Sequence, residues 1–190
     1  MPRIQDQAYI YHITRLENMA SILARGLLPR RGLRGFADVA DPEILDGRAA
    51  QNLDTCVPFH FFAGNPFDGR VHEDYPDSDF VLIAVSRELA RERGWRVIPI
   101  HPLAREGARV YQYDEGFNAI DWEAMNRRDY RDPFSKRVCM AECLSPEPVL
   151  IADVSAFYVS NERVQQQVNM LMRDACISKW VNVNRGMFRR

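Results

Sequence analysis

One carboxylate lies inside an apolar run late in the chain, and it is the side chain best suited to catalysis. Glu142 stands within residues 138–144, where the other side chains are Val, Cys, Met, Ala, Cys and Leu. Burying an unpaired carboxylate is costly, so Glu142 must be held by a donor in a cleft or face solvent. Alternation along a strand allows the second arrangement, with Glu142 exposed at a sheet edge. Glu142 is therefore the first catalytic candidate, and an exposed edge residue is the alternative.

A second polar group is expected where the first strand ends. Residues 8–13 are rich in aromatic and β-branched side chains, which predicts a strand. Thr14 and Glu17 have the spacing of a capping box, which would begin a helix that ends at Gly26. A lone histidine in a strand is commonly structural. The place of His12 at the end of a strand, two residues before the predicted helix cap, favours a binding role instead. His60, between two phenylalanines, is interpreted as structural, although its face could line the same cleft.

An arginine is the candidate for binding phosphate. Residues 29–54 have an irregular pattern, which is typical of a functional loop, and residues 44–48 predict a short helical turn that carries Arg48. The planar guanidinium fork suits phosphate oxygens. Because guanidinium stays protonated near neutral pH, charge stabilisation is favoured over proton abstraction. The alternative is that Arg48 is a surface residue on a loop.

Aromatic and basic side chains are interleaved in residues 102–137, directly before Glu142. Rings can stack on bases and cations can bind a phosphate backbone, so this segment predicts a surface for single-stranded nucleic acid. Trp122, at helical spacing with Met125, is expected in the core instead. The side chains expected to contact DNA are Tyr111, Tyr113, Arg127, Arg128, Arg131 and Lys136.

Composition predicts one globular domain over residues 1–190, with 46% hydrophobic and 27% charged residues. The formal net charge of -1 excludes a global attraction to polyanions, so any nucleic-acid contact must come from local clusters. The four cysteines form no CxxC pair and lack histidines at zinc-finger spacing, so no metal site is expected. No signal peptide or membrane-spanning run is found, which predicts a cytoplasmic protein without membrane contact.

The order of elements predicts an α+β fold. Short strands are expected at residues 56–62, 79–85, 96–100, 154–159 and 180–183, with short helices over 86–93, 120–125 and 161–173. These elements lack the regular alternation of a doubly wound sheet. No GxGxxG follows a strand and no GxxxxGK[ST] occurs, so neither a Rossmann nor a P-loop interpretation is supported.

Several motifs, taken in order, resemble the DarT family of DNA ADP-ribosyltransferase toxins from bacterial toxin–antitoxin pairs. They are Ile-Tyr-His-Ile-Thr at residues 10–14, Val-Pro-Phe-His-Phe at 57–61, Asp-Trp-Glu-Ala at 121–124 and Ala-Glu-Cys-Leu at 141–144. The segment Cys-Ile-Ser-Lys-Trp at 176–180 is similar to the closing stretch of the family. Each motif alone is weak, but their common order over nearly the whole chain is fairly specific.

The resemblance implies an ADP-ribosyltransferase-like split β-sheet with flanking helices that clamps NAD. The implied reaction transfers ADP-ribose from NAD to a base of single-stranded DNA and releases nicotinamide, without a metal. By motif match, Glu142 and Arg48 are implied as catalytic, and His12, Ile13, Thr14 and Arg48 as NAD contacts. The implied partner is DarG, an antitoxin whose macrodomain removes the modification.

The motif around Glu142 departs from the thymine-modifying members. Those members have a Lys-Gln or similar pair before Ala-Glu and Phe-Leu after it, whereas this chain has Cys139-Met140 and Cys143-Leu144. The acceptor is therefore expected to be guanine or thymine, with a slight preference for guanine. The adenosine contacts in residues 29–54 stay open. Two alternatives remain: an ADP-ribosyltransferase acting on RNA or protein, and a non-catalytic module that binds NAD or another nucleotide.

Overall fold

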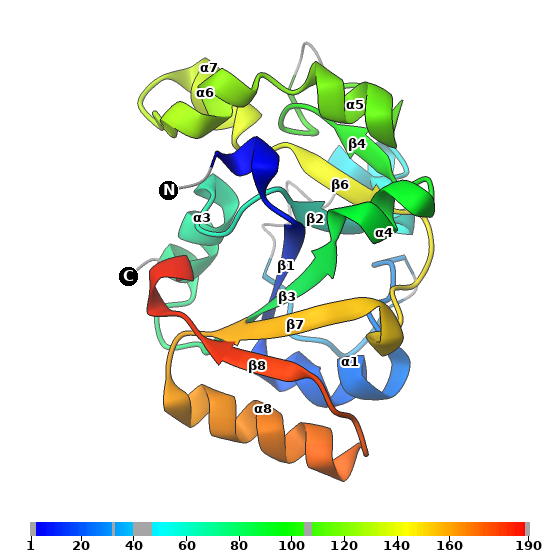
Figure 1. Ribbon diagram of the computed structural model, residues 1–190, viewed down its shortest axis with the longest axis vertical. Coiled ribbons are helices and arrows are strands. Elements are labelled where there is room, and N and C mark those ends of the chain that lie inside the picture. The colour runs from blue at the N-terminus through cyan, green and yellow to red at the C-terminus, as the bar shows by residue number, and fades with distance from the viewer. Residues whose placement is uncertain (1–2, 32, 40–46, 105–107, 189–190) are drawn as a thin grey trace.

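The protein is built on one mixed β-sheet (Figure 1). The structure, a computed structural model, describes residues 3–31, 33–39, 47–104 and 108–188. Within these residues the sheet has eight strands in the order β5-β4-β6-β2-β1-β3-β7-β8, antiparallel except for the parallel pair β7 and β8. The strands are β1 Tyr9–Arg15, β2 Val57–His60, β3 Phe80–Ser86, β4 Arg96–Ile98, β5 Tyr111–Gln112, β6 Glu142–Ser145, β7 Val154–Val159 and β8 Trp180–Val183.

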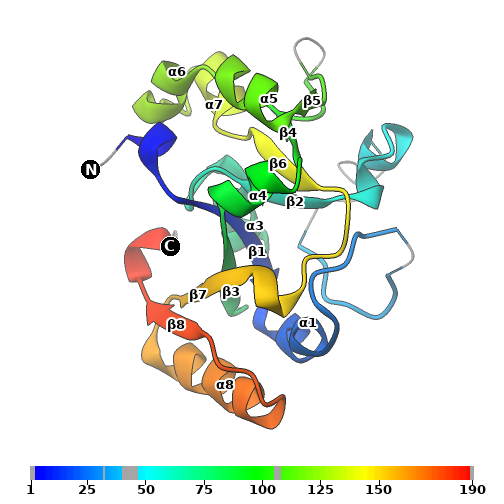
Figure 2. The same ribbon diagram turned by 45° about the vertical axis from the view of Figure 1, so that its right-hand side comes forward.

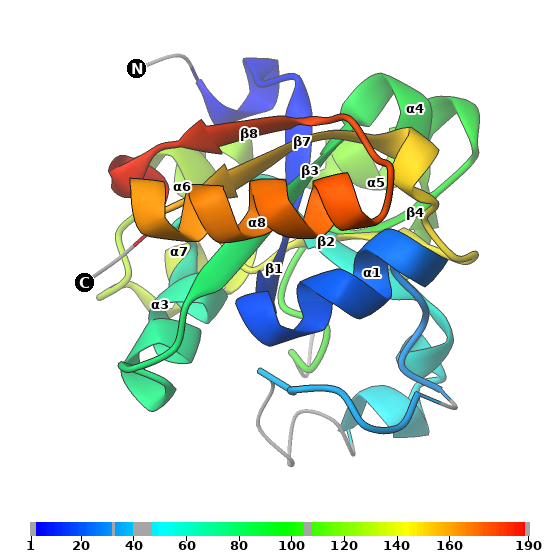
Figure 3. The same ribbon diagram turned by 90° about the horizontal axis from the view of Figure 1, so that it is seen from below.

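Helices cover both faces of this sheet. α1 and α8 pack on one face, where Met19 and Val168 join a core that includes Ile83 and Phe157 (Figure 3). On the opposite face Val71 of α3 packs with Ile13. α5, α6 and α7 gather at the β4 end, far from α8 (Figure 1). The helices are α1 Met19–Arg25, α3 Pro66–Asp74, α4 Arg87–Glu92, α5 Tyr113–Ala119, α6 Trp122–Arg127, α7 Pro133–Val138 and α8 Glu162–Asp174.

The sheet splits between β1 and β2. β1 pairs with β3 along its whole length, but it pairs with β2 only where Tyr11 lies opposite His60. Pro58 lies on the open side of β2, and its carbonyl accepts a hydrogen bond from the His12 side chain. In an antiparallel strand the N–H and C=O of one residue point to the same side. At Pro58 this side faces away from β6, so the N–H that proline lacks is not needed for pairing with β6. The expected α+β fold with a split sheet is therefore confirmed.

The helix after β1 begins later than the sequence predicts. β1 continues to Arg15, a 3₁₀ turn follows at Leu16–Asn18, and only then does α1 start. The Thr14 hydroxyl accepts a hydrogen bond from the Asn18 side chain, 3.1 Å away, and Glu17 pairs with Arg15. The predicted capping box is therefore wrong, because both of its side chains have other partners.

The predicted end of α1 is confirmed. Gly26 has a φ of 80°, and a Cβ at this position would lie 2.6 Å from the Val149 carbonyl oxygen. Only glycine allows both this backbone angle and this close approach. The turn leads into an isolated antiparallel bridge between Leu27 and Val149. Figure 2 shows this segment projecting to one side, beside β2 and α1.

Candidate active site

Glu142 forms a buried ion pair with Arg48 at the split. Arg48 Nη1 lies 2.7 Å from both carboxylate oxygens, and the side chains are 10% and 7% exposed. Glu142 opens β6, an interior strand between β2 and β4, so the exposed edge position is excluded. Arg48 lies in the helical residues 47–50; the rest of the predicted turn, residues 44–46, lies outside the described residues. A charge-assisted pair of this kind satisfies the buried carboxylate.

One nitrogen of the Arg48 guanidinium is available to a ligand. Its Nη2 is buried and has no hydrogen-bond partner in the described part of the chain. A buried N–H group without an acceptor costs roughly 1–3 kcal/mol. An anionic or carbonyl oxygen in the cavity would satisfy this donor, which is the chemistry expected of a phosphate-bearing substrate.

His12 lies across the split from Glu142. Its Nδ1 is 2.8 Å from the Pro58 carbonyl oxygen, and because a carbonyl only accepts, Nδ1 carries the proton. Burial lowers the pKa of His12 to about 4, so the ring is neutral near pH 7. The other ring nitrogen then presents a lone pair. His12 can thus accept a hydrogen bond from a ligand hydroxyl.

Two further histidines border the same space. His60 Nδ1 is 3.2 Å from the Ala141 carbonyl oxygen, and His101 Nδ1 accepts from the Leu103 N–H at 3.3 Å. Burial lowers the pKa of both rings. The carboxylate is therefore surrounded by neutral imidazoles, and Arg48 is the cation paired with it.

Asn18 holds the loop around Ala37 beside the end of β1 by hydrogen bonds. Its side-chain amide donates to the Ala37 carbonyl at 2.8 Å and accepts from the Ala37 N–H at 2.9 Å, while also donating to Thr14. On the same loop Asp38 forms an ion pair with Arg30. Residues 33 and 35–39 are held in this way as one wall of the cavity.

These side chains line one cavity of about 230 Å³. Its walls are mostly apolar, with a few converging polar groups, which is typical of ligand sites. The cavity brings together the residues predicted from opposite ends of the chain. They are His12, Ile13, Thr14, Arg48 and Glu142.

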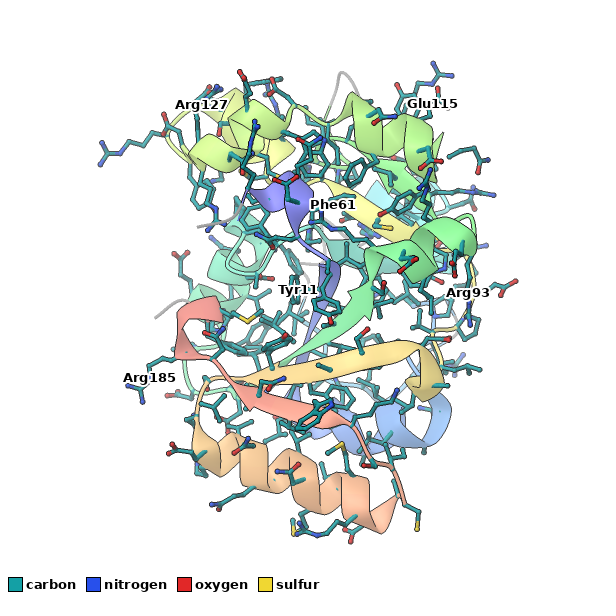
Figure 4. The ribbon with its side chains drawn as sticks, in the orientation of Figure 1. Tyr11, Phe61, Arg93, Glu115, Arg127 and Arg185 are labelled. Atoms are coloured by element: carbon teal, nitrogen blue, oxygen red, sulfur yellow. The ribbon has the colours of Figure 1, made fainter. Side chains whose placement is uncertain are left out.

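The predicted DNA-binding side chains lie outside this lining, towards the β5 and α6 end of the sheet. Arg127, Arg128, Arg131 and Lys136 are exposed and Tyr111 is half-buried; Figure 4 labels Arg127 at the periphery beside α6. Arg128 also has its guanidinium 4.8 Å from the centre of the Phe62 ring. These exposed groups remain candidates for a nucleic-acid surface.

Tyr113 is a correction to the predicted DNA surface. Its side chain is buried in the core, and its ring stacks on Phe117 with centroids 5.9 Å apart. Burial also raises its pKa. A base cannot stack on this ring without displacing core contacts, so Tyr113 is a packing residue. Trp122 is buried in the same core, as predicted.

Sequence reasoning missed Asn18 and His101 as lining residues. Asn18 was hidden by the predicted helix start, in which it would have been an ordinary first-turn residue. His101 follows β4 and is brought to the cavity by a hydrogen bond from its N–H to the Arg137 carbonyl, 2.9 Å away. Neither position carries a local signal, because both depend on contacts between distant segments.

No group of three or more His, Cys, Asp or Glu side chains among the described residues is placed to hold a metal ion. Among the helices of residues 3–31, 33–39, 47–104 and 108–188, none combines the length and apolar character needed to cross a membrane.

The fold is similar to several solved structures. Thermus sp. 2.9 DarT in complex with ADP-ribosylated ssDNA has a TM-score of 0.84 at 19% identity, with 96% of each chain covered. The same protein in complex with NAD+ has a TM-score of 0.80 at 18% identity, covering 97% of this chain and 98% of that one. Thermosipho africanus DarTG in complex with ADP-ribose has a TM-score of 0.77 at 23% identity, covering 96% of this chain and 51% of that one.

The sequence itself gives the family. A comparison with curated proteins finds no significant match. A family model described as "ssDNA thymidine ADP-ribosyltransferase, DarT" matches residues 11–189, which include the motifs of the resemblance except for Ile10. The resemblance expected from those motifs is thereby confirmed: the chain belongs to the DarT family of single-stranded DNA ADP-ribosyltransferases.

Proposed function

We propose that this protein transfers ADP-ribose from NAD to a base of single-stranded DNA, with Glu142 and Arg48 as its catalytic pair. The observation that carries the proposal is the buried Arg48–Glu142 pair in a cavity that His12, Ile13 and Thr14 also line. Membership of the DarT family supports the reaction type. The complexes of Thermus DarT with NAD+ and with ADP-ribosylated ssDNA support the two substrates.

Glu142 would act by electrostatic stabilisation. In the reaction the bond from the ribose C1′ to the nicotinamide nitrogen breaks, and its electron pair leaves with neutral nicotinamide. Positive charge develops on the ribose, and a fixed carboxylate beside that sugar stabilises it. The base nitrogen then bonds to C1′ and releases its proton to water. Because Glu142 is an interior strand residue, its carboxylate is held in place before the substrate binds.

Arg48 would hold both the carboxylate and the substrate. One nitrogen, Nη1, contacts Glu142, while the unpartnered Nη2 suits an oxygen of the NAD pyrophosphate. His12 would accept a hydrogen bond from another hydroxyl of NAD through its free ring nitrogen. Thr14 would not cap a helix. Its hydroxyl would accept the hydrogen bond from Asn18, beside the loop that Asn18 holds.

We propose thymine as the first acceptor base to test, with guanine second. The description of the family model names thymidine, so it lends no support to the slight preference for guanine. DNA contacts are assigned to Tyr111, Arg127, Arg128, Arg131 and Lys136, which lie outside the cavity. Such a toxin would act in the cytoplasm and be opposed by a macrodomain antitoxin of the DarG kind. The similarity to the Thermosipho protein, which is named DarTG, supports a DarG partner.

The acceptor range tests this function. Labelled NAD is incubated with single-stranded oligonucleotides that contain only thymine or only guanine as a reactive base, and with matched duplex, RNA and protein pools. The expected product is an oligonucleotide that has gained one ADP-ribose unit on thymine. Transfer to guanine alone would show that guanine, not thymine, is the acceptor base. Transfer to RNA or protein alone would show that single-stranded DNA is not the acceptor. Binding of NAD without any transfer would favour the non-catalytic module.

A further inference from the structure

His60 occupies the strand position directly opposite the proposed catalytic carboxylate. A cross-strand row runs from Tyr11 in β1 through His60 in β2 and Glu142 in β6 to Ile98 in β4. Side chains opposite each other in such a row project from the same face, with Cβ atoms about 5 Å apart. Both His60 and Glu142 line the cavity. His60 is therefore the polar neighbour of Glu142 on its β2 side.

The hydrogen bond of His60 fixes which ring nitrogen carries the proton. Nδ1 lies 3.2 Å from the Ala141 carbonyl oxygen, and a carbonyl can only accept, so the proton is on Nδ1. The ring also packs against Phe67, with centroids 5.4 Å apart. These two contacts hold the imidazole in place. They leave Nε2 as an acceptor that has no hydrogen bond within the described residues, on a ring that borders the cavity.

Two neighbouring acceptors select a ligand with two neighbouring donors. An ionised carboxylate only accepts, and a neutral imidazole with its proton on Nδ1 only accepts at Nε2. A vicinal diol offers two O–H donors on adjacent carbons, and the ribose that Glu142 would contact carries such a diol. Arg48 can only donate hydrogen bonds, and its Nη1 donates to the Glu142 carboxylate. The acceptor Nε2 of His60 therefore still needs a donor from the ligand.

We propose that His60 is a substrate-binding residue whose Nε2 accepts a hydrogen bond from one hydroxyl of the nicotinamide ribose, while Glu142 accepts from the other. This assignment rests on the proposed use of NAD. It gives His60 two linked tasks. The Nδ1–H side anchors the residue before Glu142, and the Nε2 side positions the sugar against the carboxylate.

The test combines variants of His60 with altered substrates. His60→Phe keeps a ring against Phe67 but removes both ring nitrogens, and His60→Gln restores an acceptor on a side chain of similar reach. His72→Phe is the matched control, because His72 has the same kind of Nδ1 bond, to the Asp68 carbonyl at 2.6 Å, outside the cavity. Each protein is titrated calorimetrically with NAD and with NAD analogues lacking the 2′- or the 3′-hydroxyl of the nicotinamide ribose, and folding is checked by thermal melting.

The unaltered protein should bind the analogue that lacks the hydroxyl facing His60 about three- to tenfold more weakly than NAD, as expected for one neutral hydrogen bond. It should bind the analogue that lacks the hydroxyl facing Glu142 at least about tenfold more weakly, because that hydrogen bond has a charged acceptor. His60→Phe should lose discrimination against one analogue and keep it against the other, and His60→Gln should regain part of it. Discrimination unchanged in His60→Phe, or lost equally in His72→Phe, would overturn the assignment while leaving NAD use intact. Failure of the unaltered protein to bind NAD would instead overturn the proposed function on which the assignment rests.

Discussion

Arg48 Nη1 lies 2.7 Å from both carboxylate oxygens of Glu142, although the two residues are 94 positions apart in the chain. The pair is buried at the split of the sheet, where β1 and β2 separate. The carboxylate proposed as catalytic and its cation thus meet where the strands leave space for a ligand.

Breaking the ion pair from one side should cost more than removing it entirely. Arg48→Met leaves Glu142 buried without its cation, and we expect a loss of about 3–5 kcal/mol in the free energy of unfolding. Arg48→Met combined with Glu142→Gln should lose less than Arg48→Met alone, and so clearly less than the sum of the single changes, since no buried charge is left unpaired. Denaturant titration of the three variants measures this coupling. Additive losses would show that the two side chains do not interact.

The stability of the protein should fall as the pH is lowered from about 6.5 to about 4. Burial lowers the pKa of His12 from 6.5 to about 4, so the unfolded chain binds more protons than the folded one between these values. The full stabilisation from neutral His12 is present above pH 6.5, and its complete loss below the folded pKa is worth up to about 3 kcal/mol. The lowered pKa values of His60 and His101 add in the same direction.

Urea titrations at several pH values, with His12→Gln as the comparison, measure this effect. The variant should have a shallower pH dependence over the same window, because one of the titrating groups is gone. An identical pH dependence in the two proteins would show that His12 titrates normally in the folded state.

Asn18 should affect NAD binding through the loop it fastens. Asn18→Ala removes both hydrogen bonds to Ala37 and the one to Thr14, so the wall formed by residues 33 and 35–39 loses its anchor. We expect the KM for NAD to rise about tenfold, in line with one or two neutral hydrogen bonds, with little change in kcat. Asn118→Ala, an exposed change on α5, is the control. A fall in kcat alone would contradict the proposed role of the loop.

The exposed cations near α6 and α7 should contribute to DNA affinity rather than to chemistry. Arg127→Ala or Lys136→Ala should weaken single-stranded DNA binding and lower the slope of log affinity against log salt by about 0.7 for each lost phosphate contact. Fluorescence anisotropy over a salt series measures both quantities. Arg173→Ala on α8, at the far end of the sheet, is the matched control (Figure 1). Equal effects at all three positions would indicate non-specific attraction only.

Local sequence signals predicted a helix or strand well where its own residues determine its backbone, as at helix N-caps. The strand expected at residues 180–183 is β8, and Asn161, Ser86 and Asp121 each accept a hydrogen bond from the first turn of the helix they precede. α3 and α7 were missed although each begins with the Asn-Pro or Asp-Pro signal of a helix start. Their weak apolar periodicity hid them.

The site could be predicted only in part. The apolar surroundings of Glu142 indicate burial, and the family motifs give His12 and Thr14, because these signals are local. The pairing of Glu142 with Arg48 and the placing of His60 and His101 depend on how distant strands align. Pro58 is a signal that could have been used, since a proline in an otherwise apolar strand indicates an unpaired side. That unpaired side is the split.

The role of Glu142 is tested most directly by one comparison of transfer rates. Labelled NAD and a thymine-containing single strand are incubated with the unaltered protein, with Glu142→Gln and with Glu147→Gln, an exposed carboxylate on the loop after β6. The proposal predicts a rate lower by at least about 10²–10³ for Glu142→Gln, as for removal of a group that stabilises a charged transition state, with NAD still bound and Glu147→Gln unaffected. Transfer by Glu142→Gln at the rate of the unaltered protein would contradict it.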